Sequence, residues 1–239
     1  MLDIPTDMYT QVQTEIHLTV TDIPSYEERG FFIQPNTKEL DKANDPLFLK
    51  AKAIVDHLGN EFNWKDIVFI IQQSFDFVKT NPHVNINEQK EQVITILDYI
   101  IDLTDTPYLP DAYTDPLFKL LVPPLVNLIS KSINGDIVPI ISTNPPTGDS
   151  FKVFIKEMKE TFSDGFQWSD LVVCIEDTIS FIGGFPSLST QEKKKATIDI
   201  IDTLIDITDT PFVPDMIADP IFKALARPVV DFVFDKLAH

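Results

Sequence analysis

The sequence predicts an all-α protein: two tandem four-helix units from an internal duplication, with an N-terminal arm. Residues 45–135 align without a gap with residues 149–239 at a constant offset of 104, with 29 identities in 91 positions. Sixteen of these identities fall within the 29 positions 98–126. Both copies also carry helical hydrophobic periodicity and helix-start signals. We therefore expect both copies to fold alike.

The repeat is too long for a solenoid, whose units have about 20–50 residues, so it indicates a duplicated small domain. The predicted segments are an N-terminal arm over 1–44, a first helical repeat over 45–134, a linker over 135–148 and a second helical repeat over 149–239. Within the arm, residues 21–24 (TDIP) echo residues 104–107 (TDTP). We interpret the arm as a partial repeat.

The first helix of each unit should begin at Asp45 or Asp149, since Asp is a favoured N-cap. Pro46 then occupies the first helical position, where proline is tolerated.

The second helix should begin near Trp64 or Trp168. The tracts that follow have enough β propensity for a strand to be an alternative. Their apolar positions continue past ten residues, through Phe77 and Phe181, and this length favours a helix.

The third helix has the clearest pattern. Asn85 with Glu88, and Ser189 with Glu192, have the spacing of a capping box. An apolar face follows in both copies, with acidic residues opposite it. The apolar face comprises Val93, Ile94, Leu97, Ile100 and Ile101, matched by Ile198, Ile201, Leu204 and Ile205.

The fourth helix should follow a turn-rich segment and begin at Asp115 or Asp219, each followed by proline. Pro124 and Pro228 lie about two turns later and should kink or split it. The turn-rich segments, 104–115 and 208–219, should be alike.

Composition limits the classes of partner. The net charge is −18, from 37 acidic and 19 basic residues. Such a charge disfavours binding to nucleic acid or to anionic membranes, and it suits basic protein partners, divalent cations or plain solubility. No apolar run approaches the roughly 18 residues of a membrane span, and the N-terminus lacks the pattern of a signal peptide.

The one cysteine, Cys174, lies in an apolar tract and aligns with Ile70, so we expect a buried and unreactive thiol. A chain without a second cysteine has no internal disulfide, which favours a reducing compartment. The protein should be intracellular, either soluble or within a protein assembly.

Duplicated aspartates are the one constellation with chemical content. The candidate metal ligands are Asp98, Asp102, Asp105, Asp202, Asp206 and Asp209, with Asp111, Asp115, Asp215 and Asp219 nearby. Clustered carboxylates suit Ca²⁺, but there is no EF-hand pattern. The favoured interpretation is structural: a polar helix face, N-caps at Asp115 and Asp219, and Asp105, Asp111 and Asp209 bonding turn amides.

Other chemistry has little support. His17, His57, His83 and His239 have no zinc-ligand spacing, and no nucleophile elbow is present, so we expect neither an enzyme nor a cofactor. The aromatic pairs Phe62–Trp64 and Phe166–Trp168 favour a core position over an apolar ligand site between the helices.

The sequence thus favours a non-catalytic structural or protein-interaction subunit of a larger assembly. One alternative is a Ca²⁺-binding protein that uses the Asp clusters. Another is an acidic inhibitor that mimics nucleic acid.

Overall fold

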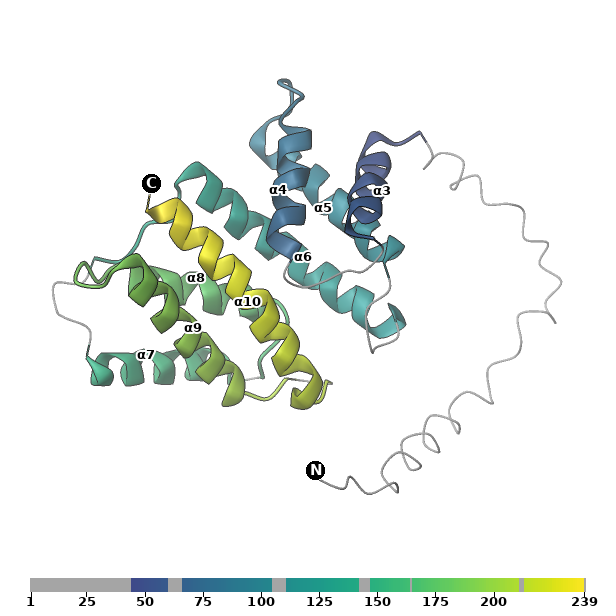
Figure 1. Cartoon of the computed structure of the whole chain (residues 1–239). Coiled ribbons are helices and arrows are strands. Elements are labelled where there is room, and N and C mark those ends of the chain that lie inside the picture. Colours follow the sequence, from purple (N-terminus) through teal and green to yellow (C-terminus); the bar gives the residue numbers. More distant parts are fainter. Residues whose placement is uncertain are drawn as a thin grey trace, which may run out of the picture. The chain divides into compact units, whose positions relative to one another are not determined.

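The computed structural model describes residues 44–59, 66–104, 111–141, 147–163, 165–210 and 213–238. These residues belong to one compact unit, Ala43–His239, while Met1–Lys42, which holds most of the predicted arm, lies outside them. The described residues are helical and contain no strand (Figure 1). Their helices are α3 (Pro46–Leu58), α4 (Ile67–Val78), α5 (Ile86–Leu103), α6 (Asp111–Asn134), α7 (Gly148–Thr161), α8 (Asp170–Gly183), α9 (Thr190–Asp206) and α10 (Asp215–Leu237).

The apolar tracts with competing β propensity are helices. They form α4 and α8, whose buried residues lie on one side while Phe69 and Val173 remain exposed. A long apolar stripe with a helical period therefore outweighs local β propensity here.

The predicted capping boxes are present. In α5 the Glu88 amide donates to Asn85 Oδ1 at 3.1 Å, and the Asn85 amide donates to Glu88 Oε2 at 3.1 Å. In α9 the Ser189 amide donates to Glu192 Oε2 at 2.8 Å. Helix α3 is capped as predicted, since the Leu47 amide donates to Asp45 Oδ1 at 2.9 Å.

Three predicted N-caps are wrong, and the first is Asp149. Helix α7 is capped by Thr147, whose hydroxyl accepts from the Ser150 amide at 3.1 Å. The Ser150 hydroxyl in turn accepts from the Thr147 amide at 3.1 Å. This reciprocal pair begins the helix two residues earlier and leaves Asp149 in the first turn, where its charge favours the helix dipole.

The other two are Asp115 and Asp219, which lie inside α6 and α10. In α10 the Pro214 carbonyl already accepts from the Ile217 amide at 2.8 Å and from the Ala218 amide at 3.0 Å. The first turn is therefore complete before Asp219 is reached. The preceding turn-rich segments are accordingly shorter than predicted.

The prolines near the middle of α6 and α10 do not split them, contrary to one of the two predicted outcomes. Helix α10 continues through Pro228 to Leu237, and Leu225 and Val229, on either side of Pro228, are buried. Burial of both flanking turns offsets the missing backbone hydrogen bond.

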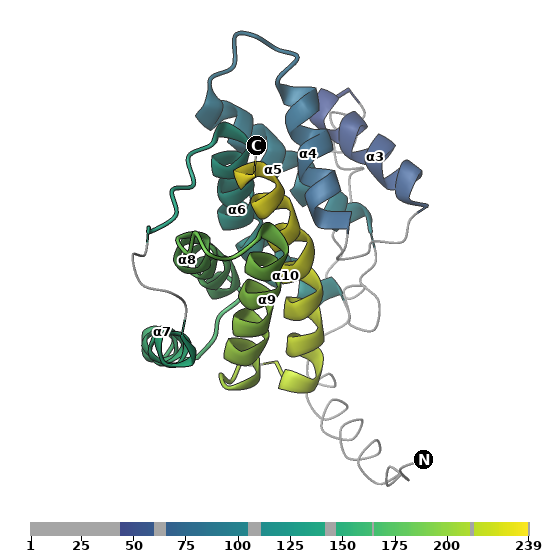
Figure 2. The ribbon, with the colours of Figure 1, turned by 60° about the vertical axis from the view of Figure 1, so that its left-hand side comes forward.

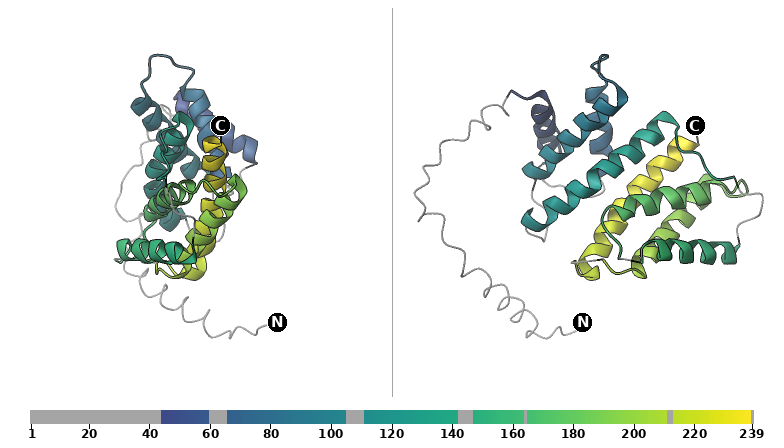
Figure 3. Two further views of the ribbon diagram at one scale, coloured as in Figure 1. Left: turned by 90° about the vertical axis from the view of Figure 1, so that its left-hand side faces the viewer. Right: turned by 180° about the vertical axis from the view of Figure 1, so that it is seen from behind.

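Helices α6 and α10 contact each other and hold the unit together (Figure 1). Helix α6 also contacts α4, α5 and α8, and α10 also contacts α4, α8 and α9. Figure 2 shows α9 and α10 as neighbouring helices, with α7 seen end-on to the left of α9, and Figure 3 shows α6 and α10 from behind. The buried apolar side chains form one continuous core that includes residues of all eight described helices.

Aromatic side chains join the two predicted units. The Phe118 ring of α6 lies 5.5 Å from the Trp168 ring, and Trp168 lies 4.7 Å from Phe222 of α10. All three are buried, and so is Phe166, so the predicted core position of the Phe166–Trp168 pair is confirmed. Phe62 and Trp64 lie outside the described residues. In the described part of the chain, no helix is both long enough and apolar enough to cross a bilayer.

Candidate functional site

The aspartates of the first repeat face a lysine of the next helix. Asp102 of α5 and Lys119 of α6 form an ion pair with 2.6 Å between the carboxylate oxygen and Nζ. Asp98 is half-buried one turn away, and burial raises its pKa, while Lys119 opposes that effect. Asp105 and the side chain of Asp111 lie outside the described residues.

The second repeat contains the same arrangement 104 residues later. Asp206 of α9 pairs with Lys223 of α10 at 2.5 Å, and Asp202 pairs with Arg227 at 2.8 Å. The aspartates thus act as one side of ion pairs that join consecutive helices. The side chains of these pairs are 24–57% exposed, so each pair contributes about 0–1 kcal/mol to stability.

Two carboxylates of this cluster are poorly solvated. Oδ1 of Asp202 and Oδ1 of Asp219 are buried and accept no hydrogen bond from the described residues. Burial raises the pKa of both groups, and the neighbouring Asp215 raises that of Asp219 further. The charged forms of Asp202 and Asp219 are therefore less favourable in the fold than in water.

The turn before α10 is held by a residue other than the predicted Asp209. The Thr210 amide donates to Asp215 Oδ1 at 3.2 Å, whereas the Asp209 side chain is exposed. The Asp209 backbone carbonyl instead accepts from the Phe166 amide at 3.0 Å.

Within the described ranges, no three His, Cys, Asp or Glu side chains converge as an ion site would require. The candidate ligands that can be placed are Asp98, Asp102, Asp202, Asp206 and Asp209. Three of them, Asp102, Asp206 and Asp202, form ion pairs with Lys119, Lys223 and Arg227 respectively.

The basic run 193–195 is likewise neutralised. Lys193 Nζ donates to the Gly183 carbonyl at 2.9 Å, where it offsets the negative end of the α8 dipole. Lys194 pairs with Asp235 at 2.7 Å, and Lys195 pairs with Asp199 at 2.5 Å. The run does not form a free basic patch.

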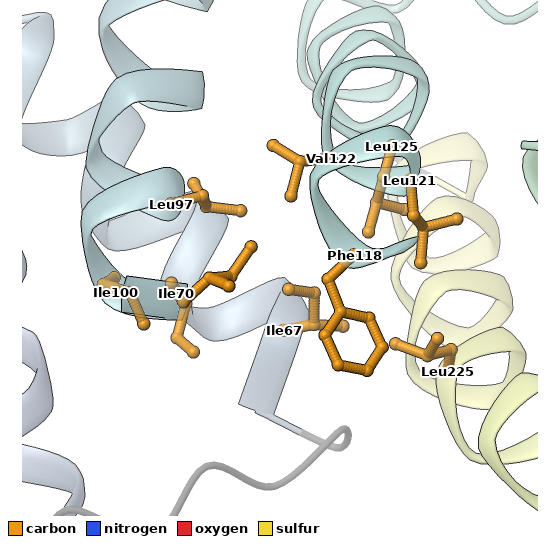
Figure 4. A pocket seen from close by; sticks show the side chains of 10 residues that line it. Ile67, Ile70, Leu97, Ile100, Phe118, Leu121, Val122, Leu125 and Leu225 are labelled. Carbon is orange, nitrogen blue, oxygen red and sulfur yellow. The ribbon is translucent and has the colours of Figure 1, made fainter. Parts of the chain in front are cut away.

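An apolar cavity lies between α4, α5, α6 and Leu225 of α10 (Figure 4). Its volume is about 20 Å³, close to that of one water molecule. The lining is entirely apolar and gives water no hydrogen-bond partner. Drug-sized ligands occupy roughly 300–1,000 Å³, so this cavity is a packing defect rather than a ligand site.

A larger groove of about 620 Å³ opens between α7, α8 and the linker. Its apolar lining consists of Ile140, Val153, Phe154, Met158 and Phe181, and its polar lining of Asp149, Ser150, Glu157, Asp177 and Ser180. The groove therefore combines an apolar surface with three carboxylates and no cation. Sequence reasoning missed it, although the linker tract 137–141 (IVPII) is unusually apolar for a loop.

The linker is fixed beside this groove. The Ile140 amide donates to the Ser180 carbonyl at 3.0 Å, and the side chain of Ile137 is buried. A β-carbon on Gly184 would lie 1.6 Å from the Ile140 carbonyl oxygen. The linker backbone can therefore lie against residue 184 only because that residue has no side chain. Gly183 ends α8 and Gly184 is its C-cap, so the end of this helix also supports the linker.

Anchoring the linker backbone leaves its apolar side chains in water. Val138 is 77% exposed, Ile140 70% and Ile141 83%, and Val153 of α7 is 55% exposed. We call these four residues and the groove lining the linker face.

Comparison with known proteins gives no relative. No protein-family model matches the chain, and neither the curated proteins nor the solved structures contain a significant match.

Proposed function

We propose that this chain is a non-catalytic protein-interaction subunit, built from two duplicated helical units, that works within a larger assembly. Positional agreement between the repeats supports the duplication. Helix α5 begins at Ile86 and α9 at Thr190, and α6 begins at Asp111 and α10 at Asp215, so both pairs of starts keep the offset of 104.

The cross-helix ion pairs also support the duplication. Asp102–Lys119 and Asp206–Lys223 join matching helix pairs at the same offset. The two units therefore share contacts between side chains on different helices, as well as similar sequences along each helix. This is expected when an ancestral unit with the same packing was copied.

The observation that carries the interaction role is the linker face. Isolated exposed apolar residues are ordinary, but a fixed segment that presents Val138, Ile140 and Ile141 beside a groove is not. Contiguous apolar surface with a polar rim marks interaction sites in soluble proteins. The partners are proteins, including basic ones, because the net charge of −18 disfavours nucleic acid. We place the protein inside the cell, where Cys174 stays reduced.

Affinity purification of the tagged full chain from its native source, followed by mass measurement of the intact complexes, tests this role. We expect a reproducible complex of fixed stoichiometry with at least one other protein. Recovery of the chain alone would contradict the proposal. A single nucleic-acid-binding enzyme as partner would favour the mimic instead.

A calcium titration distinguishes the remaining alternative. Under the interaction role, Ca²⁺ leaves the melting temperature unchanged. A rise that Asp98→Asn with Asp202→Asn abolishes would instead establish the cation-binding function. Asp76→Asn with Glu91→Gln, at exposed sites on α4 and α5, is the charge-matched control.

A further inference from the structure

We propose that the groove between α7 and α8 binds a basic amphipathic helix of a partner protein. The inference rests on the proposed interaction role and specifies the chemistry of the partner. A groove lined by residues of α7 and α8, with an apolar floor, is the setting in which a partner helix lays its apolar face.

The floor offers aromatic and aliphatic surface. Phe154 of α7 and Phe181 of α8 stack with ring centroids 4.3 Å apart. Met158 closes the floor, and the exposed Val153 and Ile140 rise beside it. Such a surface accepts apolar side chains that repeat every three or four residues on one face of a helix.

The rim sets the sign of the partner's charge. Asp149 and Glu157 lie on α7 and Asp177 lies on α8, while no lysine, arginine or histidine lines the groove. Among the described residues, neither Glu157 nor Asp177 has an ion-pair partner, and Asp149 pairs only with the exposed Lys152. Partial burial raises the pKa of Asp177 and the neighbouring Glu176 raises it further, while Lys131, which is ion-paired to Glu176, opposes them only in part. An incoming cation would therefore relieve an unfavourable charge.

The spacing of the rim carboxylates suggests the register of the partner. Asp149 and Glu157 are eight residues apart, which on a helix corresponds to about 12 Å along the axis. Lysine or arginine residues seven or eight positions apart on the partner helix match that distance. Apolar positions between them would face Val153 and Phe154.

Charge also decides against the other candidates for this groove. A second copy of the chain carries the same net charge of −18, so pairing through an acidic rim would bring like charges together. In residues 1–43, acidic residues outnumber basic ones, so that segment does not have the required charge either. A basic partner gains from both the floor and the rim.

The groove in the first repeat makes a natural comparison. It lies between α3 and α4 and has a volume of about 320 Å³. Its lining includes Phe77, the counterpart of Phe181, but it contains no carboxylate. At the positions of Glu157 and Asp177 the first repeat has Ala53 and Gln73. The docking surface is therefore particular to the second repeat.

Fluorescence anisotropy with the full chain tests the inference. The probe is a labelled synthetic helix of about 18 residues, five turns, with leucine on one face and lysine on the other. The comparison peptides replace lysine by glutamate, or leucine by glutamine. We expect the leucine–lysine peptide to bind and both others to bind at least about tenfold more weakly, because floor and rim must act together.

Substitutions locate the binding. Glu157→Gln with Asp177→Asn should weaken binding about five- to tenfold, and Val153→Ser with Ile140→Ser by at least as much. The control Asp76→Asn with Glu91→Gln removes the same number of charges away from the groove and should change affinity less than about twofold. These positions are exposed, and circular dichroism confirms that each variant is folded.

Three results would overturn the inference: an equal loss in the control variant, equal binding of the lysine–glutamine peptide, or dimerisation through this groove in sedimentation. Native purification with Glu157→Gln and Asp177→Asn separates the two proposals. If the natural complex survives these substitutions, the groove inference is wrong while the interaction role stands. If the unmodified chain has no partner at all, the interaction role itself is wrong.

Discussion

Replacing Gly184 by alanine tests whether the linker sits on the end of α8. The added β-carbon would lie 1.6 Å from the Ile140 carbonyl oxygen and 2.5 Å from its carbonyl carbon. Ordinary contacts need about 3.5–4 Å, so the linker must move by roughly 2 Å. That shift breaks the hydrogen bond from the Ile140 amide to the Ser180 carbonyl, now 3.0 Å long.

The cost follows from these two effects. Losing the hydrogen bond costs about 0.5–1.5 kcal/mol, and forcing a methyl group into an occupied site costs about 1–3 kcal/mol. Gly184 has φ −70° and ψ −9°, a right-handed conformation that alanine adopts freely. Alanine therefore recovers about 0.4–1 kcal/mol by restricting the unfolded chain. The net loss is about 0.5–4 kcal/mol, a fall in melting temperature of roughly 1–16 °C.

Urea unfolding measures the loss, and hydrogen exchange at the Ile140 amide reports whether the linker is released. Gly148→Ala is the matched control, because a β-carbon on Gly148 has no neighbour within 4 Å. It should leave stability unchanged or slightly raised. If Gly184→Ala were as stable as Gly148→Ala and kept its Ile140 amide protected, the linker could not occupy this position.

Three further predictions follow from the core and the aspartates. Trp168→Ala should cost about 3–5 kcal/mol in chemical denaturation, because it removes a side chain that is 4% exposed and contacts Phe118 and Phe222; a loss under about 1 kcal/mol would place Trp168 at the surface. Asp219→Asn should raise stability at pH 7, because the folded pKa of Asp219 lies above its unfolded value, so its ionised form destabilises the fold. That gain should fade as the pH falls through the folded pKa towards the unfolded value near 3.8, and thermal melts at neutral and acid pH would reveal the opposite sign if the carboxylate were well solvated. Burial raises the pKa of the Cys174 thiol to about 12, so a thiol reagent at pH 8 should label it only as fast as the protein unfolds, and immediate labelling would show an accessible thiol.

The features of the fold that depend on neighbouring residues in the sequence could be predicted. The capping boxes of α5 and α9 depend on residues three positions apart, so the sequence contains both partners. The start of α10 could not be predicted so well, because Asp215 and Asp219 are both plausible caps. The structure decides between them, because the Pro214 carbonyl accepts the first backbone hydrogen bonds of the helix, and this places the helix start at Asp215.

The interactions of the site were harder to predict because their partners are distant in sequence. The acidic stripe of α5 and α9 is visible as a pattern, but the pairing with Lys119 and Lys223 depends on how the next helix packs. The groove draws residues from the linker, α7 and α8. Only the packed helices bring Ile140, Val153 and Phe181 to one surface.

The aromatic contact between Phe118 and Trp168 has a consequence for cooperativity. Because one hydrophobic core runs through α6 and α10, the two halves of the unit share a single core and do not have a separate core each. A fragment ending at Asn134 would lose the contact of Phe118 with Trp168, and a fragment beginning at Gly148 would lose the same contact from the other side. With the proposed duplication, the chain is equivalent to a dimer whose subunits are covalently joined. Its two halves should melt in a single transition whose midpoint does not depend on protein concentration.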